Sequence, residues 1–416
     1  MSNSKSIQVF EYQTLKVGED PRFTSKHFNA MEKYGYKTKE KFYNVGNNRI
    51  KFNNYVGVIQ VDNITIEILP KADNLDSNQS SKDKWHNALI DMLHECRLIK
   101  LNSITNANLK LKSATILDLF FDLFLTETEL IYKQGLRKQY RKVEENIHSL
   151  KGKILFTNHI KKNAFHKERF YVSHELFDPN NKLNQILFKA IVILRDISSN
   201  LNFTTRINHL LLNFENISEK NITRAWFDNI KFDRNTERYR QAINLAKLII
   251  LRYAPDLKGG KENVLAIMFD MNLLYENYIY RKLQILQKDN LIPVNRIKEQ
   301  NRQPFWESKG IKADIVIEGS SKIVVIDTKW KVLNELTPSD ADLKQMFVYN
   351  LHYQSELSIL LYPKTNHTTQ EKKAFRHENF NGKYCQLAFV NLFDENERLD
   401  KKVGYNIYNE LIKHNL

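Results

Sequence analysis

Alternating hydrophobic and polar residues mark the first seventy residues of the chain as rich in strands. The segment Ile7–Tyr12 predicts one strand. Tyr55–Val61 and Ile64–Pro70 predict a hairpin, because Asp62–Asn63 between them suits a tight turn. The next segment, Asp73–Lys84, is polar and is predicted to be a loop.

Beyond Trp85 the hydrophobic residues recur every three or four positions, which is the spacing that buries one face of a helix. A basic stretch lies among these helices: residues 131–170 hold eleven Lys or Arg against three Asp or Glu. The helices predicted from the spacing are Trp85–Leu98, Ala114–Leu136, Lys182–Ile197 and Glu237–Tyr253.

The pattern changes again after residues 254–261, where Pro255 and the pair Gly259–Gly260 predict a domain boundary. Helix, two strands, helix and strand follow in that order, which is typical of a compact α/β domain. The predicted elements are a helix Val264–Gln287, strands Ile311–Ile317 and Lys322–Trp330, a helix Ser339–Tyr353, strands Leu357–Tyr362 and Tyr384–Val390, and a terminal helix.

These elements predict an α/β chain, α+β overall, in three parts. Residues 1–105 form a β-rich domain, and residues 106–255 form a mainly helical segment that includes the basic stretch. Residues 256–416 form a domain with a mixed sheet flanked by helices.

Two carboxylates and an ammonium group are expected to meet on the strand pair of the last domain. Side chains two positions apart on a strand share a face, so Asp327 and Lys329 point the same way. If Ile317 pairs with Lys322 across the turn, Asp314 lies opposite Val325 and on that same face.

This set of side chains suits the hydrolysis of a phosphodiester. Mg²⁺ prefers oxygen ligands and keeps several waters, so Asp314 and Asp327 suffice to hold it, with Mn²⁺ as an alternative ion. Lys329 is placed to orient the attacking water or to stabilise the developing charge. Glu276 on the preceding predicted helix is a candidate further ligand, and Gln345 on the following one a supporting residue, with Tyr349 four positions on. An Asp-x-Lys sequence alone is also common at solvated strand ends. Asp314, Glu276 and Gln345 beside it favour a catalytic site over this alternative.

The charge of the chain agrees with a phosphate-rich partner. The formal net charge is +15, and the excess of eight in residues 131–170 supplies more than half of it. That stretch has three interpretations: contact with DNA, contact with an acidic partner protein, or a solvated surface. The candidate DNA-binding residues there are Lys138, Arg141, Lys142, Lys151 and Lys153.

Other classes of site and location are not predicted. Cys96 and Cys385 lack the spacing of a disulfide framework or a metal site, which favours a reducing cytoplasm, and the histidines show no zinc-ligand spacing. The N-terminus has no apolar signal core, and the most apolar run, Ile116–Leu125, is too short and too charged to cross a membrane. Gly259-Gly260-Lys261 lacks the rest of a phosphate-binding loop, so this chain is not expected to hydrolyse nucleotides itself.

The arrangement around Asp314 and Asp327-Thr-Lys329 resembles the PD-(D/E)xK nuclease superfamily, with Ala313 where the motif has Pro. More narrowly, nearly the whole chain resembles the McrC family, the nuclease subunits of McrBC modification-dependent restriction systems. The segments that carry this resemblance are Val56–Val61, Thr65–Lys71, Gly135–Arg137, Leu150–Ile154, Asn184 after Asp178-Pro179, Met271–Glu276, Ile326–Trp330, Gln345-Met346 and Tyr349.

The resemblance implies a division of labour. McrC-like subunits bind an McrB-like AAA+ GTPase hexamer, which recognises modified cytosine and translocates the DNA. The N-terminal half of the subunit docks on the ring and stimulates its hydrolysis, which here assigns partner docking to the β-rich domain 1–105. By motif position, Asp314 and Asp327 match the metal-binding carboxylates and Lys329 the catalytic lysine, while Glu276 and Gln345 match supporting positions.

The expected function is therefore Mg-dependent cleavage of double-stranded DNA, activated by an AAA+ GTPase, in the restriction of foreign DNA. Two alternatives remain. One is a DNA nuclease that works without a partner, and the other is a non-catalytic activator or adaptor of an AAA+ ring.

Overall fold

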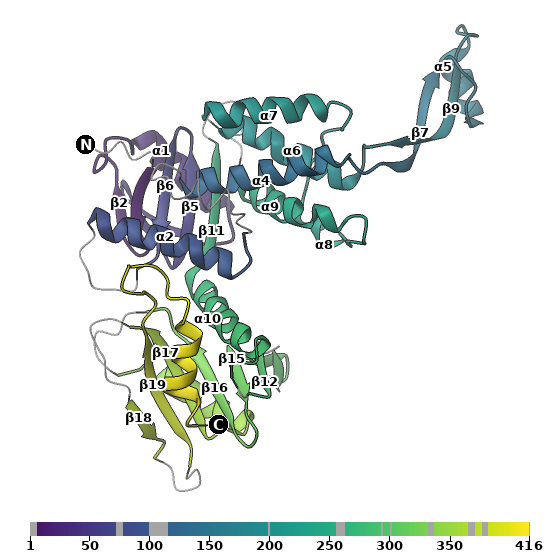
Figure 1. The fold of residues 1–416 in the computed structure, drawn as a ribbon. Helices are drawn as coiled ribbons and strands as arrows, with labels where there is room; N and C mark the ends of the chain where they lie inside the picture. The colour runs from purple at the N-terminus through teal and green to yellow at the C-terminus, as the bar shows by residue number, and fades with distance from the viewer. Residues whose placement is uncertain are drawn as a thin grey trace. The chain divides into compact units, whose positions relative to one another are not determined.

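The chain divides into two compact units, which are each described by themselves (Figure 1). The first unit combines residues 1–116 with residues 268–416, and the second is residues 117–267. The predicted domain division at residues 105 and 255 stays a prediction, and both boundaries fall outside the described residues. The computed structural model describes residues 6–71, 78–99, 115–198, 200–254, 263–292, 294–299, 302–331, 337–364, 371–376 and 382–415.

The N-terminal part of the first unit is built on strands, as predicted. β1 (Ser6–Phe10) pairs in parallel with β6 (Ile64–Leu69), which pairs in antiparallel with β5 (Tyr55–Val61). The predicted hairpin is confirmed, since Val61 lies opposite Ile64 and Asp62 in the turn has a φ of 50°. The other elements here are β2 (Thr14–Lys16), α1 (Ser25–Lys37), β3 (Tyr43–Gly46), β4 (Arg49–Phe52) and α2 (Gln79–Glu95).

Helix α2 corrects the predicted loop Asp73–Lys84 in its second half. The helix begins at Gln79, and the side chain of Asn78 caps it by accepting a hydrogen bond of 2.9 Å from the Ser81 N–H. The first turn exposes mostly polar side chains, so hydrophobic spacing did not reveal it. Residues 72–77 lie outside the described residues.

The second unit is mainly helical around a buried core. The predicted helices Ala114–Leu136 and Lys182–Ile197 are confirmed as α4 (Ile116–Lys133) and α6 (Lys182–Ile197). The predicted helix Glu237–Tyr253 begins with a 3₁₀ turn and ends one residue early, because Tyr253 joins a short strand. The remaining elements are α7 (Leu201–Asn213), α8 (Arg224–Asp228), the turn Glu237–Tyr239, α9 (Arg240–Arg252), β10 (Tyr253–Ala254) and β11 (Val264–Asp270), of which residues 268–270 belong to the first unit.

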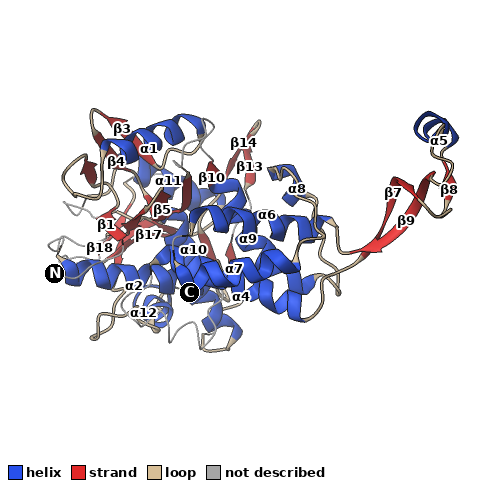
Figure 2. Ribbon diagram, turned by 90° about the horizontal axis from the view of Figure 1, so that it is seen from above, coloured by secondary structure: helices blue, strands red, loops and turns tan. Residues whose placement is uncertain are grey.

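A long hairpin, residues 139–178, extends from these helices and is called the arm below (Figure 2). Its strands β7 (Gln139–Ile147) and β9 (Phe170–Asp178) pair over nine residues, and β8 (Lys153–Ile154) and α5 (Phe156–Asn163) lie at its far end. Within the basic stretch, the helix α5 is accompanied by a ribbon of strands, made of β7, β8 and the start of β9. Hydrophobic periodicity did not predict it, because a ribbon this narrow leaves most side chains partly exposed on both faces.

Side chains from two helical segments hold the root of the arm. Asn181 and Asn184 each donate a side-chain hydrogen bond to the Arg137 carbonyl, at 2.7 and 3.0 Å. The buried Tyr239 hydroxyl accepts from the Arg137 N–H at 2.8 Å and donates to Asn184 Oδ1 at 3.0 Å. At the far end Gly152 has a φ of 74°, and a Cβ there would collide with the Ser173 carbonyl oxygen. Several residues that carried the family resemblance thus shape the arm.

The C-terminal part of the first unit contains a six-stranded mixed sheet, which confirms the predicted mixed sheet. Its order is β12-β15-β16-β17-β19-β18. The pairs β16–β17 and β17–β19 are parallel, and the other three pairs are antiparallel. The strands are β12 (Arg296–Glu299), β15 (Ile315–Glu318), β16 (Ile323–Thr328), β17 (Leu357–Pro363), β18 (Glu371–Ala374) and β19 (Tyr384–Val390).

Helices pack on this sheet. α11 (Asp340–His352) packs through Met346 and Tyr349 against Val325, Leu360 and other sheet residues. A small hairpin of β13 (Gln303–Trp306) and β14 (Lys309–Ile311) precedes β15, and the chain ends in α12 (Val403–Ile407) and a π-helical turn Tyr408–Ile412. No helix among the described residues is both long and apolar enough to cross a membrane.

One predicted helix is partly wrong. Val264–Gln287 begins as β11, and the helix α10 runs from Met271 to Lys288, capped by the side chain of Asp270. Val264–Phe269 is a continuous apolar run, and such a run fits a buried strand as well as a buried helix.

A buried hydrogen bond joins the N-terminal and C-terminal parts of the first unit. The Trp330 indole N–H donates to Glu11 Oε1 at 2.6 Å, and the Lys71 N–H donates to the same oxygen at 3.0 Å. The Trp330 ring also packs edge-on against Trp85. Burial raises the pKa of Glu11 from 4.5 to about 7, although both hydrogen bonds act in the opposite direction.

The stability of the chain is therefore expected to depend on the protonation of Glu11. Between pH 4.5 and about 7 the folded chain holds a proton on Glu11 that the unfolded chain has lost, so the free energy of unfolding falls as pH rises. The Glu11→Gln variant keeps the acceptor oxygen and lacks this titration. In denaturant unfolding, the free energy of unfolding of the wild type should fall relative to that of the variant by about 3 kcal/mol between pH values below 4.5 and above 7. Parallel pH curves for the two proteins would contradict this assignment.

Candidate active site

The register of β15 and β16 places the predicted residues together. Ile315 pairs with Ile326 and Glu318 with Ile323, and the Gly319 N–H donates to the Lys322 carbonyl at 2.9 Å. The predicted pairing of Ile317 with Lys322 is wrong by two residues, because the turn is centred one residue further along the chain than expected. A shift of two residues keeps every side chain on its face.

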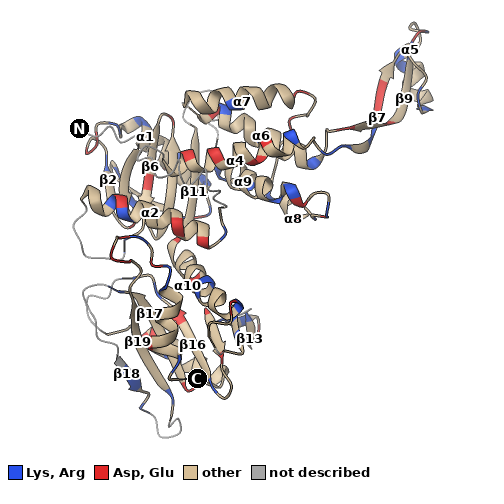
Figure 3. Cartoon of the chain, in the orientation of Figure 1, with Lys and Arg blue, Asp and Glu red and all other residues tan. Residues whose placement is uncertain are grey.

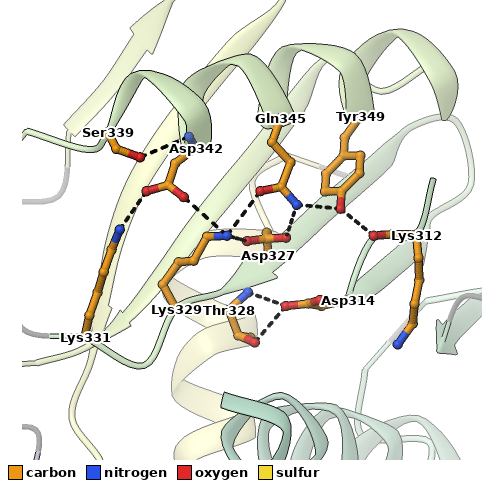
Figure 4. Close-up of polar contacts among 10 residues, drawn as sticks. All are labelled: Lys312, Asp314, Asp327, Thr328, Lys329, Lys331, Ser339, Asp342, Gln345 and Tyr349. Atoms are coloured by element: carbon orange, nitrogen blue, oxygen red, sulfur yellow. Dashed lines mark hydrogen bonds and ion pairs between the residues drawn. The ribbon is translucent and has the colours of Figure 1, made fainter. Parts of the chain in front are cut away.

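Asp314 therefore still lies near Asp327, just before β15. Its Oδ2 accepts two hydrogen bonds from Thr328, one from the backbone N–H and one from the hydroxyl, each of 2.8 Å (Figure 4). These bonds fix the carboxylate of Asp314 against the end of β16.

Asp327 lies at the carboxyl end of β16 and is only 2% exposed. Its Oδ1 accepts a hydrogen bond of 3.2 Å from Gln345 Nε2, and the Lys329 ammonium lies 2.7 Å from its Oδ2. The latter contact is an ion pair by distance, but Oδ2 receives no hydrogen bond of good geometry.

Helix α11 supplies the partners of Lys329. The ammonium lies 3.2 Å from Gln345 Oε1 and 3.4 Å from Asp342 Oδ1. Asp342 stands in the first turn of α11, where Ser339 caps the helix, and it also pairs with Lys331 at 2.7 Å. Lys329 is thus held between the strand end and the helix (Figure 4).

Tyr349 positions Gln345 from the next turn of α11. Gln345 Nε2 donates to the Tyr349 hydroxyl at 2.7 Å, and that hydroxyl donates to the Lys312 carbonyl. The chain Asp327–Gln345–Tyr349 therefore links the strand end to the segment that carries Asp314.

The electrostatics of the site favour an added cation. Burial and then the charge of Asp327 raise the pKa of Asp314 from 3.8 to about 6. Burial also raises the pKa of Asp327, although Lys329 opposes this. Burial alone would lower the pKa of Lys329, but Asp327 and Asp342 raise it, so it stays charged. Two buried carboxylates share one neighbouring ammonium, and this leaves negative charge to be balanced.

The donor set fits a hard divalent ion such as Mg²⁺. Asp327 Oδ2 is a buried oxygen without a well-directed hydrogen bond, and the bonds to Thr328 occupy only one oxygen of Asp314. Mg²⁺ keeps several waters and binds through one or two carboxylates. In the part of the chain that the structure describes, no group of three or more His, Cys, Asp or Glu is placed to hold a metal.

Glu276 on α10 stands beside this pair. Its carboxylate forms an ion pair of 2.9 Å with Lys312, and its charge contributes to the raised pKa of Asp327. Its predicted role as a further ligand stays a prediction.

The candidate DNA-binding lysines lie in the other compact unit. Lys138 precedes β7, Arg141 and Lys142 lie on β7, and Lys151 and Lys153 lie near the far end of the arm, where other basic residues gather (Figure 3). Arg141 pairs with Asp178 at 2.6 Å, whereas the four lysines are exposed. Contact of these residues with DNA stays a prediction.

Two residues of the site were not predicted. Thr328 lies inside the Asp-x-Lys sequence but was not assigned a role, and Asp342 lies three positions before Gln345 on the same helix. The spacing of Asp342 is the signal that would have found it, because residues three apart on a helix share a face.

The sequence matches a known protein family over most of its length. The family model for "McrBC 5-methylcytosine restriction system component" matches residues 50–363. No curated protein matches the sequence.

Two solved structures from Thermococcus gammatolerans contain chains of similar fold. One is the refined half-complex from the tetradecameric assembly of McrB AAA+ hexamers with bound McrC. Its matching chain is 22% identical with a TM-score of 0.69, and the match covers 98% of this chain and all of that one. The other is the McrBC complex, with 21% identity and a TM-score of 0.50 over 69% of this chain and 88% of that one. At this level of identity the likeness shows the fold.

Proposed function

The chain belongs to the family of McrBC 5-methylcytosine restriction system components. We propose that it is the Mg-dependent endonuclease subunit of such a system. The observation that carries the proposal is the meeting of Asp314, Asp327 and Lys329 at one end of a mixed sheet. Charged groups buried this closely are unfavourable without a function. The reaction is the hydrolysis of a phosphodiester in double-stranded DNA.

Each residue has a role that follows from its contacts. Asp314 and Asp327 hold the metal, which when bound polarises the scissile phosphate and acidifies a water. Thr328 fixes the carboxylate of Asp314. Lys329 stabilises negative charge that develops on the phosphate, and Asp342 and Gln345 hold its ammonium in place.

The partner in this proposal is an McrB-like AAA+ hexamer that hydrolyses GTP. The support is the family membership together with the structure of McrB AAA+ hexamers with bound McrC, which contains a chain of similar fold along nearly the full length. Recognition of the modified cytosine belongs to the partner, and this chain stimulates its hydrolysis.

The arm is the proposed docking element. Its far end carries Phe156, Ile160 and Phe165, which are 68%, 67% and 96% exposed. Phe156 and Ile160 are four residues apart on α5 and share a face. Apolar side chains grouped on an exposed tip are typical of a protein interface.

The test is cleavage of plasmid DNA that carries 5-methylcytosine, with the chain, the partner, GTP and Mg²⁺ each left out in turn. We expect cleavage only when all four are present. Cleavage without the partner would favour the nuclease that works alone. Absence of cleavage under every condition, with GTP hydrolysis still stimulated, would favour the non-catalytic activator.

A further inference from the structure

A cleft of about 600 Å³ opens beside the candidate active site. Its walls include Gln345 and Tyr349, which belong to the hydrogen-bonded chain that reaches Asp327. The cleft and the site therefore share two side chains of α11. A molecule in the cleft would contact Gln345, which donates a hydrogen bond to Asp327.

Three of the nine residues that line the cleft are basic. Arg302, Lys312 and Lys344 lie on its walls, and no Asp or Glu is among the described residues that line it. Lys312 is engaged by Glu276 at 2.9 Å. The side chain of Lys344 is 80% exposed, and its distance of 3.8 Å to the exposed Asp340 makes that pair weak. Arg302 and Lys344 are the cations best placed to meet an anionic ligand.

The hairpin of β13 and β14 places an aromatic side chain at the cleft. Phe305 lines it and is 58% exposed, and the adjacent Trp306 is 64% exposed. The Gln303 side chain bonds to His352 Nε2 at 2.7 Å, which ties the hairpin of β13 and β14 to α11. A Cβ at Gly310 would lie 2.6 Å from Arg302 Cγ, so the base of the hairpin is tightly packed.

We propose that this cleft binds the DNA strand next to the scissile phosphate. Arg302 and Lys344 contact phosphates of the backbone, and Phe305 packs against a base or sugar. Cations beside an exposed aromatic ring form the pattern that binds a nucleic-acid strand. An acidic peptide would use the cations but would have no need of the ring. The inference rests on the proposed function, because the cleft adjoins the residues assigned to cleavage.

The test measures DNA affinity of the partner-bound chain at several salt concentrations. The Asp327→Asn background prevents cleavage during the measurement, and a fluorescent DNA duplex carrying 5-methylcytosine is the probe. Each phosphate contact adds about 0.9 to the slope of log affinity against log salt. Arg302→Ala and Lys344→Ala are each expected to reduce that slope by about 0.9, and together by about 1.8.

Phe305→Ala tests the ring separately. It is expected to weaken binding about tenfold without changing the salt slope, because apolar packing against a sugar of the duplex involves no counterion release. Lys322→Ala is the matched control: this lysine is 48% exposed near the turn between β15 and β16 and does not line the cleft, so the slope should not change.

Two outcomes separate the inference from the proposed function. In the first outcome, the complex with Asp327 intact cuts DNA, but the cleft variants have the same salt slope and affinity as the Asp327→Asn protein. The cleft is then not the strand-binding site, and the proposed function stands. If the unsubstituted complex neither binds nor cuts methylated DNA, both fail.

Discussion

Replacing Lys329 by Met is expected to lower kcat for DNA cleavage by the partner-bound chain about 10²- to 10³-fold, which is the usual effect of removing one electrostatic stabiliser of a transition state. Its ammonium is the one described cation that lies 2.7 Å from Asp327, and three side chains hold it there. Met is unbranched and only one atom shorter than Lys, but it carries no charge. KM for DNA should change little, because the lost interaction is made in the transition state.

The control for this variant is Lys331→Met. Lys331 lies two residues on and shares Asp342 with Lys329, but its ammonium pairs with Asp342 alone among the carboxylates of the site. Steady-state cleavage rates of the two variants give the comparison. Equal losses in both would show a general effect of charge around Asp342, and a change confined to KM would show a binding role for Lys329.

Replacing Phe156, Ile160 and Phe165 by Ser is expected to abolish stimulation of the partner's GTP hydrolysis. Apolar anchors of an interface contribute about 2 kcal/mol or more each, so the loss of all three should lower affinity for the ring about 10⁴-fold. These side chains are largely exposed in the chain itself, so their loss should not destabilise the fold. The measurement is GTP hydrolysis as a function of chain concentration.

The control for the arm uses exposed leucines of the same unit. Leu201 and Leu212 lie on α7 and are 82% and 71% exposed, and Ser at both positions should leave stimulation unchanged. A loss with these substitutions, or full stimulation by the arm variant, would place the docking surface elsewhere on the chain.

The active-site strands were predictable because their charged residues are two positions apart, which is the spacing that places side chains on one face of a strand. Asp327 and Lys329 share a face in any register, and an error of two residues in the pairing did not move Asp314 to the other face. The strand β11 was not predictable, since its apolar run has no periodicity that separates a strand from a helix.

Contacts between distant segments left no local signal. Glu11 and Trp330 meet across 319 positions of sequence, and neither has a neighbour that indicates the pairing. The position of Glu276 on the helix before the strands was predicted. Its ion pair with Lys312 was not, because it depends on packing that sequence spacing does not specify. The arm was missed because its residues form a ribbon with no buried stripe.

The most direct test of the proposed function replaces Asp327 by Asn in the complex with the AAA+ partner. Cleavage of methylated plasmid and GTP hydrolysis are followed in the same reaction with Mg²⁺. Asn has nearly the shape of Asp and removes one metal-binding carboxylate, so cleavage should fall at least about 10³-fold while stimulated GTP hydrolysis stays at the wild-type level. Cleavage at the wild-type rate by the folded variant would show that Asp327 is not part of the nuclease centre.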